Sequence, residues 1–350
     1  MKKSILLLAG LVFAFTSVLA QDEDGGLKIS GSGDIYYKYD FSGYISEDGT
    51  SNIGTSFADN QNSVSVGMLD VVLEQQVGKA SFVGEFSFGP RSFKSIPTFN
   101  IAGGDNVNIN IQNLYMSYAF SDLFSLTAGY MGTFVGYEVI SPAANFNYST
   151  SYLFSFGPFQ NAGLRADFAV SDRFAFMVGI FNDWNVYQDL NGVTDFGAQL
   201  YFLPVDGWDV YLNFLTGDQT GTIIDLTTGF QISDQFYLGL NAADFSIADG
   251  ADATPYSGFA LYPQYAFSDA FELGVRYEYF KVKDFTQDGT SYTGTKVSAF
   301  TLTANVNAGP LTFIPEFRMD SNSDEVLFVD KDMATTKSAS QFLMALVYAF

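Results

Sequence analysis

Residues 341–350, QFLMALVYAF, alternate between two kinds of side chain up to the last residue of the chain. Every second residue from Phe342 to Phe350 is large and apolar, whereas the positions from Gln341 to Ala349 carry mostly smaller side chains. A period of two residues is that of a β-strand, whose successive side chains point to opposite faces of a sheet. We therefore predict that the chain ends in a strand with one large apolar face.

The same alternation recurs in residues 207–216, 235–246 and 271–281. One face of each segment is apolar and aromatic, and the other mixes Gly, Asn and charged residues. A soluble sandwich or barrel would bury the apolar face in a packed core, whereas a membrane barrel turns it to lipid around a polar interior. We favour the membrane barrel, because in a soluble protein the apolar face of the last strand would need a second sheet to cover it.

A short turn motif sets the topology of this barrel. It consists of an apolar residue, Ser-Asp, any residue and Phe, and it occurs at 120–124, 170–174, 232–236 and 267–271. Ser and Asp stabilise tight turns by bonding to nearby backbone, and the flanking aromatics suit a girdle at one membrane interface. Three further short turns lie at 77–79, 205–207 and 308–310. Seven short turns on one side, with both termini there, predict eight hairpins.

The predicted fold is an all-β, transmembrane antiparallel β-barrel of about 16 strands. A count of 14 or 18 stays open, since residues 140–160 could hide a hairpin. The long connections fall on the opposite, external side, at about 42–61, 90–106, 136–159, 184–191, 217–220, 247–253, 284–293 and 321–336. The strands are predicted at 27–41, 62–76, 79–90, 107–120, 122–135, 160–170, 173–184, 192–203, 207–216, 221–232, 235–246, 254–267, 270–283, 294–307, 310–320 and 337–350.

The composition restricts the chemistry that the chain can perform. Its 350 residues carry a formal charge of −22, with 17% aromatic and 15% charged residues, and contain neither Cys nor His. These absences exclude disulfides, Ser-His and Cys-His catalytic units and His- or Cys-ligated zinc. So acidic a chain would repel nucleic acid. We expect no enzyme, no cofactor and no metal centre, and we favour transport, binding or a structural role.

The N-terminus predicts export. A basic start, Met1-Lys2-Lys3, precedes an apolar run that ends at Ala20, and the acidic residues Asp22-Glu23-Asp24 follow at once. This pattern is typical of a secretory signal peptide, here residues 1–20, with the barrel domain at 21–350. A transmembrane anchor is the alternative, but the apolar run is short. We expect Sec-dependent export to the outer membrane of a Gram-negative-type bacterium.

The third external loop, 136–159, is too aromatic for a solvated loop. Its polar residues interleave with Phe and Tyr, so the loop suits a position against the barrel wall with polar groups turned to water. The alternatives are an external cap and a loop packed on the surface. The candidate constriction residues are Asn145, Asn147, Tyr148 and Ser149, and Glu138 joins the candidates for the pore lining.

The charged residues on the polar face of each predicted strand should point into the barrel, and they are further candidates for the pore lining. Eight acids against four Arg would make a net-negative wall that favours cations or neutral solutes. The alternative is that each Arg only stiffens the wall by pairing with a neighbouring acid, as Arg165 with Asp167 or Arg276 with Glu278. The candidates are Glu85, Arg165, Asp167, Arg173, Asp195, Asp209, Asp225, Glu272, Arg276, Glu278, Glu316 and Arg318.

Two acidic clusters, 22–24 and 320–325, have the residue types of a divalent-cation site. The second lacks the Gly and the spacing of an EF-hand loop. We therefore expect a solvated tail and a solvated loop.

Several segments resemble the OmpL-like β-barrel porin family. They are residues 133–140, 145–149, 157–159, 88–91 and 182–185, and the resemblance spans about residues 27–350. It implies an outer-membrane porin, with a third loop that folds into the lumen as in general porins. It also implies that the terminal Phe350 is read by the barrel assembly machinery, and porins of this size are often homotrimers.

We therefore expect a water-filled channel for passive diffusion of small hydrophilic solutes or ions, embedded in outer-membrane lipid. A substrate-specific channel is the nearest alternative within transport. A structural or adhesive barrel whose external loops bind a partner is the alternative outside transport.

Overall fold

The computed structural model describes residues 25–47, 49–95, 99–100, 108–248, 251, 253–287 and 289–350. The predicted signal peptide and the acidic cluster 22–24 lie outside the described residues. In the described part of the chain, no helix combines the length and the hydropathy needed to cross a membrane.

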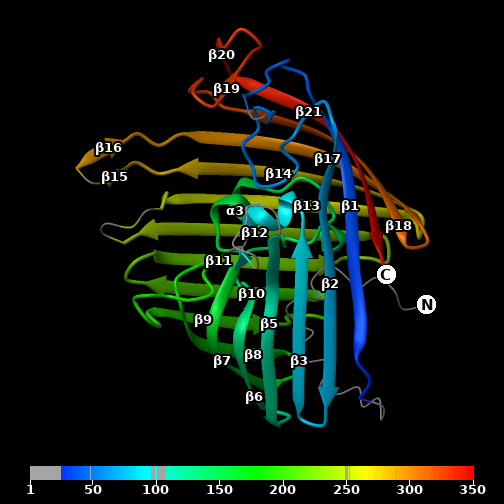
Figure 1. The fold of residues 1–350 in the computed structure, drawn as a ribbon, viewed down its shortest axis with the longest axis vertical. Coiled ribbons are helices and arrows are strands. Elements are labelled where there is room, and N and C mark those ends of the chain that lie inside the picture. The colour runs from blue at the N-terminus through cyan, green and yellow to red at the C-terminus, as the bar shows by residue number, and fades with distance from the viewer. Residues whose placement is uncertain are drawn as a thin grey trace.

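Sixteen antiparallel strands form a closed barrel (Figure 1). The barrel closes because β1 pairs with β2 on one side and with the last strand, β21, on the other. The strands are β1 (Lys28–Asp40), β2 (Val64–Val77), β3 (Ala80–Phe88), β5 (Asn108–Ser121), β6 (Phe124–Gly132), β7 (Gln160–Ser171), β8 (Phe174–Phe181), β9 (Asp195–Phe202), β10 (Trp208–Gly217), β11 (Gly221–Gln231), β12 (Phe236–Ile247), β13 (Tyr256–Ser268), β14 (Phe271–Val282), β17 (Lys296–Ala308), β18 (Leu311–Ser321) and β21 (Ser338–Ala349).

The strand count and all seven predicted short turns are confirmed, and most strand ends agree with the sequence to within two residues. The larger differences lie where a loop leaves the wall early. Strand β6 ends at Gly132, and β9 begins only at Asp195. Residues 140–160 hold no further hairpin, so counts of 14 and 18 are excluded.

The long loops carry short elements that the sequence did not predict, because a few residues show no clear period. Figure 1 places the hairpin β15–β16 at the left edge of the barrel and β19–β20 at its top. These elements are α2 (Pro90–Ser95), β4 (Phe99–Asn100), the 3₁₀ helix η1 (Pro142–Ala144), α3 (Tyr152–Phe156), β15 (Phe285–Gln287), β16 (Thr290–Tyr292), β19 (Phe328–Val329) and β20 (Thr335–Thr336).

The predicted alternation holds along the strands. On β14, Phe271 and Tyr277 are exposed on the outside, whereas Arg276 and Glu278 are fully buried inside. On β21, Leu343, Ala345 and Val347 are buried on the inner face. The barrel is therefore apolar outside, whereas its inner face carries buried polar and charged residues together with apolar ones.

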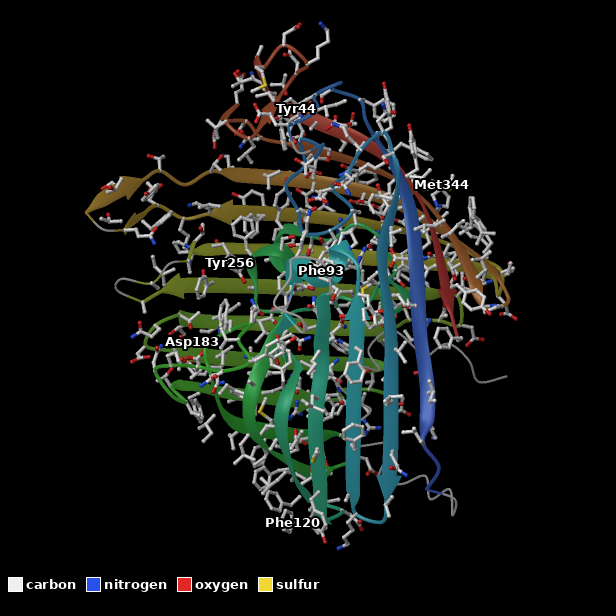
Figure 2. The ribbon with its side chains drawn as sticks, in the orientation of Figure 1. Tyr44, Phe93, Phe120, Asp183, Tyr256 and Met344 are labelled. Atoms are coloured by element: carbon white, nitrogen blue, oxygen red, sulfur yellow. The ribbon has the colours of Figure 1, made fainter. Side chains whose placement is uncertain are left out.

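Outward aromatics gather at the short-turn end. The ring centroids of Phe120 and Phe124 lie 5.4 Å apart, those of Phe124 and Phe168 5.0 Å, and those of Phe168 and Phe176 4.6 Å. Figure 2 labels Phe120 at the lower tip of the front strands. This row crosses β5, β6, β7 and β8 and has the form of the predicted aromatic girdle.

The chain end closes the barrel seam. The Gly31 N–H donates to the Phe350 carbonyl and the Phe350 N–H donates to the Gly31 carbonyl, both at 3.0 Å. The Phe350 side chain stays 56% exposed on the outer surface. A Cβ on Gly31 would lie 2.8 Å from the Phe350 ring, so the glycine leaves room for it.

Candidate functional site

The connection between β6 and β7, residues 133–159, lies against the inner wall of the barrel, and we call it the interior loop. The Gly136 N–H donates to Asp225 Oδ1 on β11 at 3.0 Å. The Asn147 Nδ2 donates to Thr303 Oγ1 on β17 at 2.7 Å. The loop thus reaches from β6 across to inward side chains of β11 and β17.

Arg276 of β14 holds the interior loop by its guanidinium group. Its Nη1 lies 2.6 Å from Glu138 Oε1 and donates to the Ser149 carbonyl at 2.6 Å. Its Nη2 donates to the Thr150 carbonyl at 3.3 Å. Arg276 is 0% exposed. A fully buried charge requires such partners, because its desolvation would otherwise be uncompensated.

Arg318 of β18 holds the loop at a second point. Its Nη1 donates to the Thr150 carbonyl at 2.7 Å. Its Nε and Nη2 donate to the two oxygens of Asp320 at 2.8 and 2.9 Å. The Tyr152 hydroxyl donates to Asp320 at 2.8 Å, and the Arg318 Cζ lies 5.2 Å from the Tyr152 ring centroid.

Two inward carboxylates accept pairs of backbone N–H groups from the loop. Glu278 accepts from Tyr152 at 2.9 Å and from Leu153 at 2.8 Å, which are the first residues of α3. The first N–H groups of a helix have no partner within the helix, so Glu278 satisfies them. Glu316 likewise accepts from Tyr148 at 3.0 Å and Ser149 at 3.3 Å.

Arg91, on α2, is a loop-holding residue that sequence reasoning missed. Its Nη1 donates to the Ile140 carbonyl at 3.0 Å and its Nη2 to the Tyr148 carbonyl at 3.1 Å. Its Cζ lies 4.7 Å from the Phe57 ring centroid and 4.8 Å from that of Tyr148. Strand alternation assigns a face only to strand residues, so it gave no signal for an arginine in a loop.

Inward glycines receive aromatic side chains of the interior loop. A Cβ on Gly274 would lie 2.3 Å from Phe146, and one on Gly239 would lie 2.5 Å from the Tyr137 hydroxyl. The Tyr137 ring also stacks on that of Tyr262, at 4.2 Å between centroids. The absent side chains make hollows in the wall, which fix where the loop lies.

Of the four constriction candidates, three contact the wall directly. Asn147 bonds to Thr303, Ser149 and Tyr148 bond to Glu316, and the Tyr148 hydroxyl donates to Asp34. Asn145 instead bonds to its own loop, through the backbone of Val139 at 2.6 and 3.0 Å.

The alternative considered for the wall charges, a pair with a neighbouring acid, is found for Arg165, whose Nε lies 3.0 and 3.1 Å from the oxygens of Asp167. Arg276 forms its ion pair with Glu138 of the loop and not with Glu278. Glu138 also accepts the N–H and hydroxyl of Ser151, each at 2.7 Å.

Five more candidates lie on the inner wall, in different settings. Glu85 accepts a hydrogen bond from Asn113, and Asp209 accepts one from the Tyr201 hydroxyl at 2.7 Å. Asp225 accepts the Asn213 amide at 2.7 Å, in addition to the loop. Glu272 is half-buried near the short-turn end of β14. Asp195 is buried, and its carboxylate has no hydrogen-bond partner among the residues that the structure describes.

Two sequence expectations need correction. Arg173 is not on the inner wall but in the β7–β8 turn, where its exposed guanidinium pairs with Asp206 at 3.0 Å. The alternation of faces does not apply to turn residues, and the predicted strand began one residue too early. Asp320 is not part of a solvated acidic loop, since it lies on β18 and is fully buried against Arg318.

Sequence reasoning also missed two inward residues of β1, Asp34 and Lys38, although the alternation of that strand carried the signal. Both are buried. Lys38 Nζ donates to Ser51 Oγ in the first long loop at 2.6 Å.

Comparison with known proteins places this barrel in a family. The model of the family described as "Putative beta-barrel porin-2, OmpL-like" matches residues 26–350. No curated protein matches the chain.

Solved outer-membrane proteins share the fold. Salmonella typhi OmpF, in complex with daunomycin, has a TM-score of 0.62 at 13% identity, over 95% of this chain and 99% of that one. The outer membrane channel DcaP of Acinetobacter baumannii has a TM-score of 0.57 at 12% identity, over 95% and 99%. The trimer form of Vibrio cholerae OmpT has a TM-score of 0.56 at 11% identity, over 93% and 99%.

Such low identities establish the shared fold alone, whereas the family model covers nearly the whole chain. The protein is an outer-membrane porin-like barrel and belongs to the OmpL-like β-barrel porin family.

Proposed function

We propose that the protein is a channel for passive diffusion of small hydrophilic solutes and ions across the outer membrane of a Gram-negative-type bacterium. The interior loop narrows its passage, and cations are weakly preferred. A barrel of 16 strands is wide enough for an aqueous channel when its lumen is not filled. The contacts of the loop with β11, β14, β17 and β18 support a narrowing on that side.

The proposed cation preference rests on the burial and pairing of the basic side chains inside the barrel. Arg91, Arg276 and Arg318 are at most 2% exposed, and all three donate to backbone carbonyls of the interior loop. Arg165 is paired with Asp167. Bases that are buried or paired in this way present little charge to a passing anion, and side-chain charges set the ion preference of a pore.

The sequence reinforces this charge pattern over six complete strands and the start of a seventh. Residues 174–275, from β8 into β14, contain 13 Asp and Glu but no Lys or Arg. Asp209, Asp225 and Glu272 of this segment are inward residues. An acidic wall without basic residues attracts cations and repels anions.

Three partners belong to the same proposal. The apolar outer wall would contact outer-membrane lipid, and the exposed Phe350 would be read by the barrel assembly machinery. A homotrimer is consistent with the trimer form of OmpT.

The structural or adhesive barrel remains the second candidate, favoured by the hairpins β15–β16 and β19–β20 at the loop end of the barrel (Figure 1). In that case the external loops would bind a partner and the barrel would pass no solute.

Swelling of proteoliposomes tests the proposal. Vesicles containing the folded, heat-modifiable protein should swell in small neutral and cationic solutes faster than in anionic solutes of equal size. Heat-denatured protein is the control. Folded protein that causes no swelling would contradict a diffusion channel, and equal rates for cations and anions would contradict the charge preference.

A further inference from the structure

Four aspartates gather at the long-loop end of β8–β11. Asp183 and Asp189 lie in the β8–β9 loop, Asp195 begins β9, and Asp218 lies in the β10–β11 turn. Thr220 Oγ1 donates to Asp183 Oδ1 at 3.4 Å, which brings this turn against the loop. Figure 2 labels Asp183 at the left, beside the ends of these strands.

Asp195 is the unusual member of this group. Its side chain is 1% exposed, and neither carboxylate oxygen has a hydrogen-bond partner within the described residues. A Cβ on Gly217 would lie 1.7 Å from Asp195 Oδ1, so the carboxylate rests on the bare backbone of β10. The neighbouring Thr194 Oγ1 is also buried without a partner. Buried oxygens of this kind normally have a partner, so these point to a ligand that supplies positive charge.

Among the described residues, no basic side chain acts on Asp195. The segment that contains all four aspartates, residues 174–275, has no Lys or Arg. Burial, followed by the negative charges of Asp189 and Asp218, raises the pKa of Asp183. The charged side chains that act on Asp195 are likewise all acidic, namely Asp183, Asp189 and Asp218.

We propose that this group of aspartates is a binding site for a hard divalent cation, centred on Asp195, that ties the β8–β9 loop to the β10–β11 turn. Carboxylate, hydroxyl and amide oxygens are the ligands that Ca²⁺ takes, in flexible sets of roughly six to eight. No three acidic side chains in the described part of the chain enclose a metal ion on their own. Water and the oxygens of Thr194, Asn191 or Thr220 would therefore complete the coordination.

Calcium titration of the folded protein in detergent tests this site, with calorimetry and thermal unfolding as readouts. We expect saturable binding of Ca²⁺ and a rise in Tm. Asp195→Asn should weaken the affinity at least tenfold, while Asp234→Asn, in an exposed turn at the opposite end, should bind as the wild type does. Asp218→Asn, at an exposed position, should also weaken binding and serves if Asp195→Asn does not fold. A parallel MgCl₂ titration should show weaker binding, because Mg²⁺ demands a stricter octahedral ligand set.

The site also predicts a pH dependence with a definite sign. Protons compete with the cation for the aspartates, so Ca²⁺ should bind less tightly and raise Tm less at mildly acidic than at neutral pH.

Absence of saturable binding, or equal Ca²⁺ affinity in Asp195→Asn, Asp218→Asn and wild-type protein, would overturn the proposal. Binding is measured without a bilayer, so the outcome is independent of whether the barrel conducts.

Discussion

Arg276 is a fully buried cation whose partners lie mainly on a loop that is more than a hundred residues away in sequence. It contacts Glu138, the Ser149 carbonyl and the Thr150 carbonyl. Buried ion pairs are costly to form but more costly to break, because removal of one partner leaves the other charged and unpaired. Such residues make the position of the interior loop depend on a few side chains.

Replacement of Arg276 should destabilise the folded protein. Arg276→Met leaves Glu138 buried without its counter-charge and should lower the free energy of unfolding by about 3–5 kcal/mol. Unfolding in guanidinium chloride, followed by tryptophan fluorescence, measures the change. Arg173→Met, which removes an exposed pair with Asp206, is the matched control and should change stability by less than about 1 kcal/mol. Equal effects of the two substitutions would contradict the holding role of Arg276.

Among the elements, the interior loop contacts both acidic and basic side chains of the inner wall. Arg276 donates to the carbonyls of Ser149 and Thr150, and Arg318 donates to the carbonyl of Thr150. Removal of this segment would therefore open space and uncover the carboxylates of Glu278 and Glu316, whereas the two arginines would stay paired with Glu138 and Asp320.

Deletion of residues 143–156 tests both consequences. Single-channel conductance should rise, and the preference for cations should persist, because Glu278 and Glu316 would lose their backbone partners while Arg276 and Arg318 keep Glu138 and Asp320 as acid partners. Deletion of residues 286–291, at the tip of the β15–β16 hairpin, is the control and should leave both quantities unchanged. If the shortened loop gives the wild-type conductance, the interior loop does not narrow the pore.

The elements differ in how far the sequence could predict them. Strands with a period of two and turns with Ser-Asp could be assigned to within a few residues, because each signal is local. Interior loop contacts such as Asn147 with Thr303 join residues 156 apart, and no local pattern specifies them. The roles of Arg91 and Glu138 likewise depend on tertiary packing, while Arg173 was misplaced because a strand end is uncertain by one residue.

At the scale of the whole molecule, charge and aromatic residues are separated by place. The outer wall carries the apolar residues and rows of stacked rings, and the inner wall carries buried acids and arginines. A lipid-facing Arg or Lys at mid-membrane would cost about 2–4 kcal/mol, which explains why the wall charges point inward. The low total charge thus agrees with the large apolar outer surface, which we propose contacts lipid.

We propose that this barrel conducts ions through a passage with an acidic bias, and recordings from planar bilayers containing the purified, folded protein measure both properties. We expect stepwise increases in conductance and, under a salt gradient, a reversal potential displaced toward that of the cation. Folded protein that inserts without any conductance would contradict the channel, and a reversal potential displaced toward that of the anion would contradict the acidic passage.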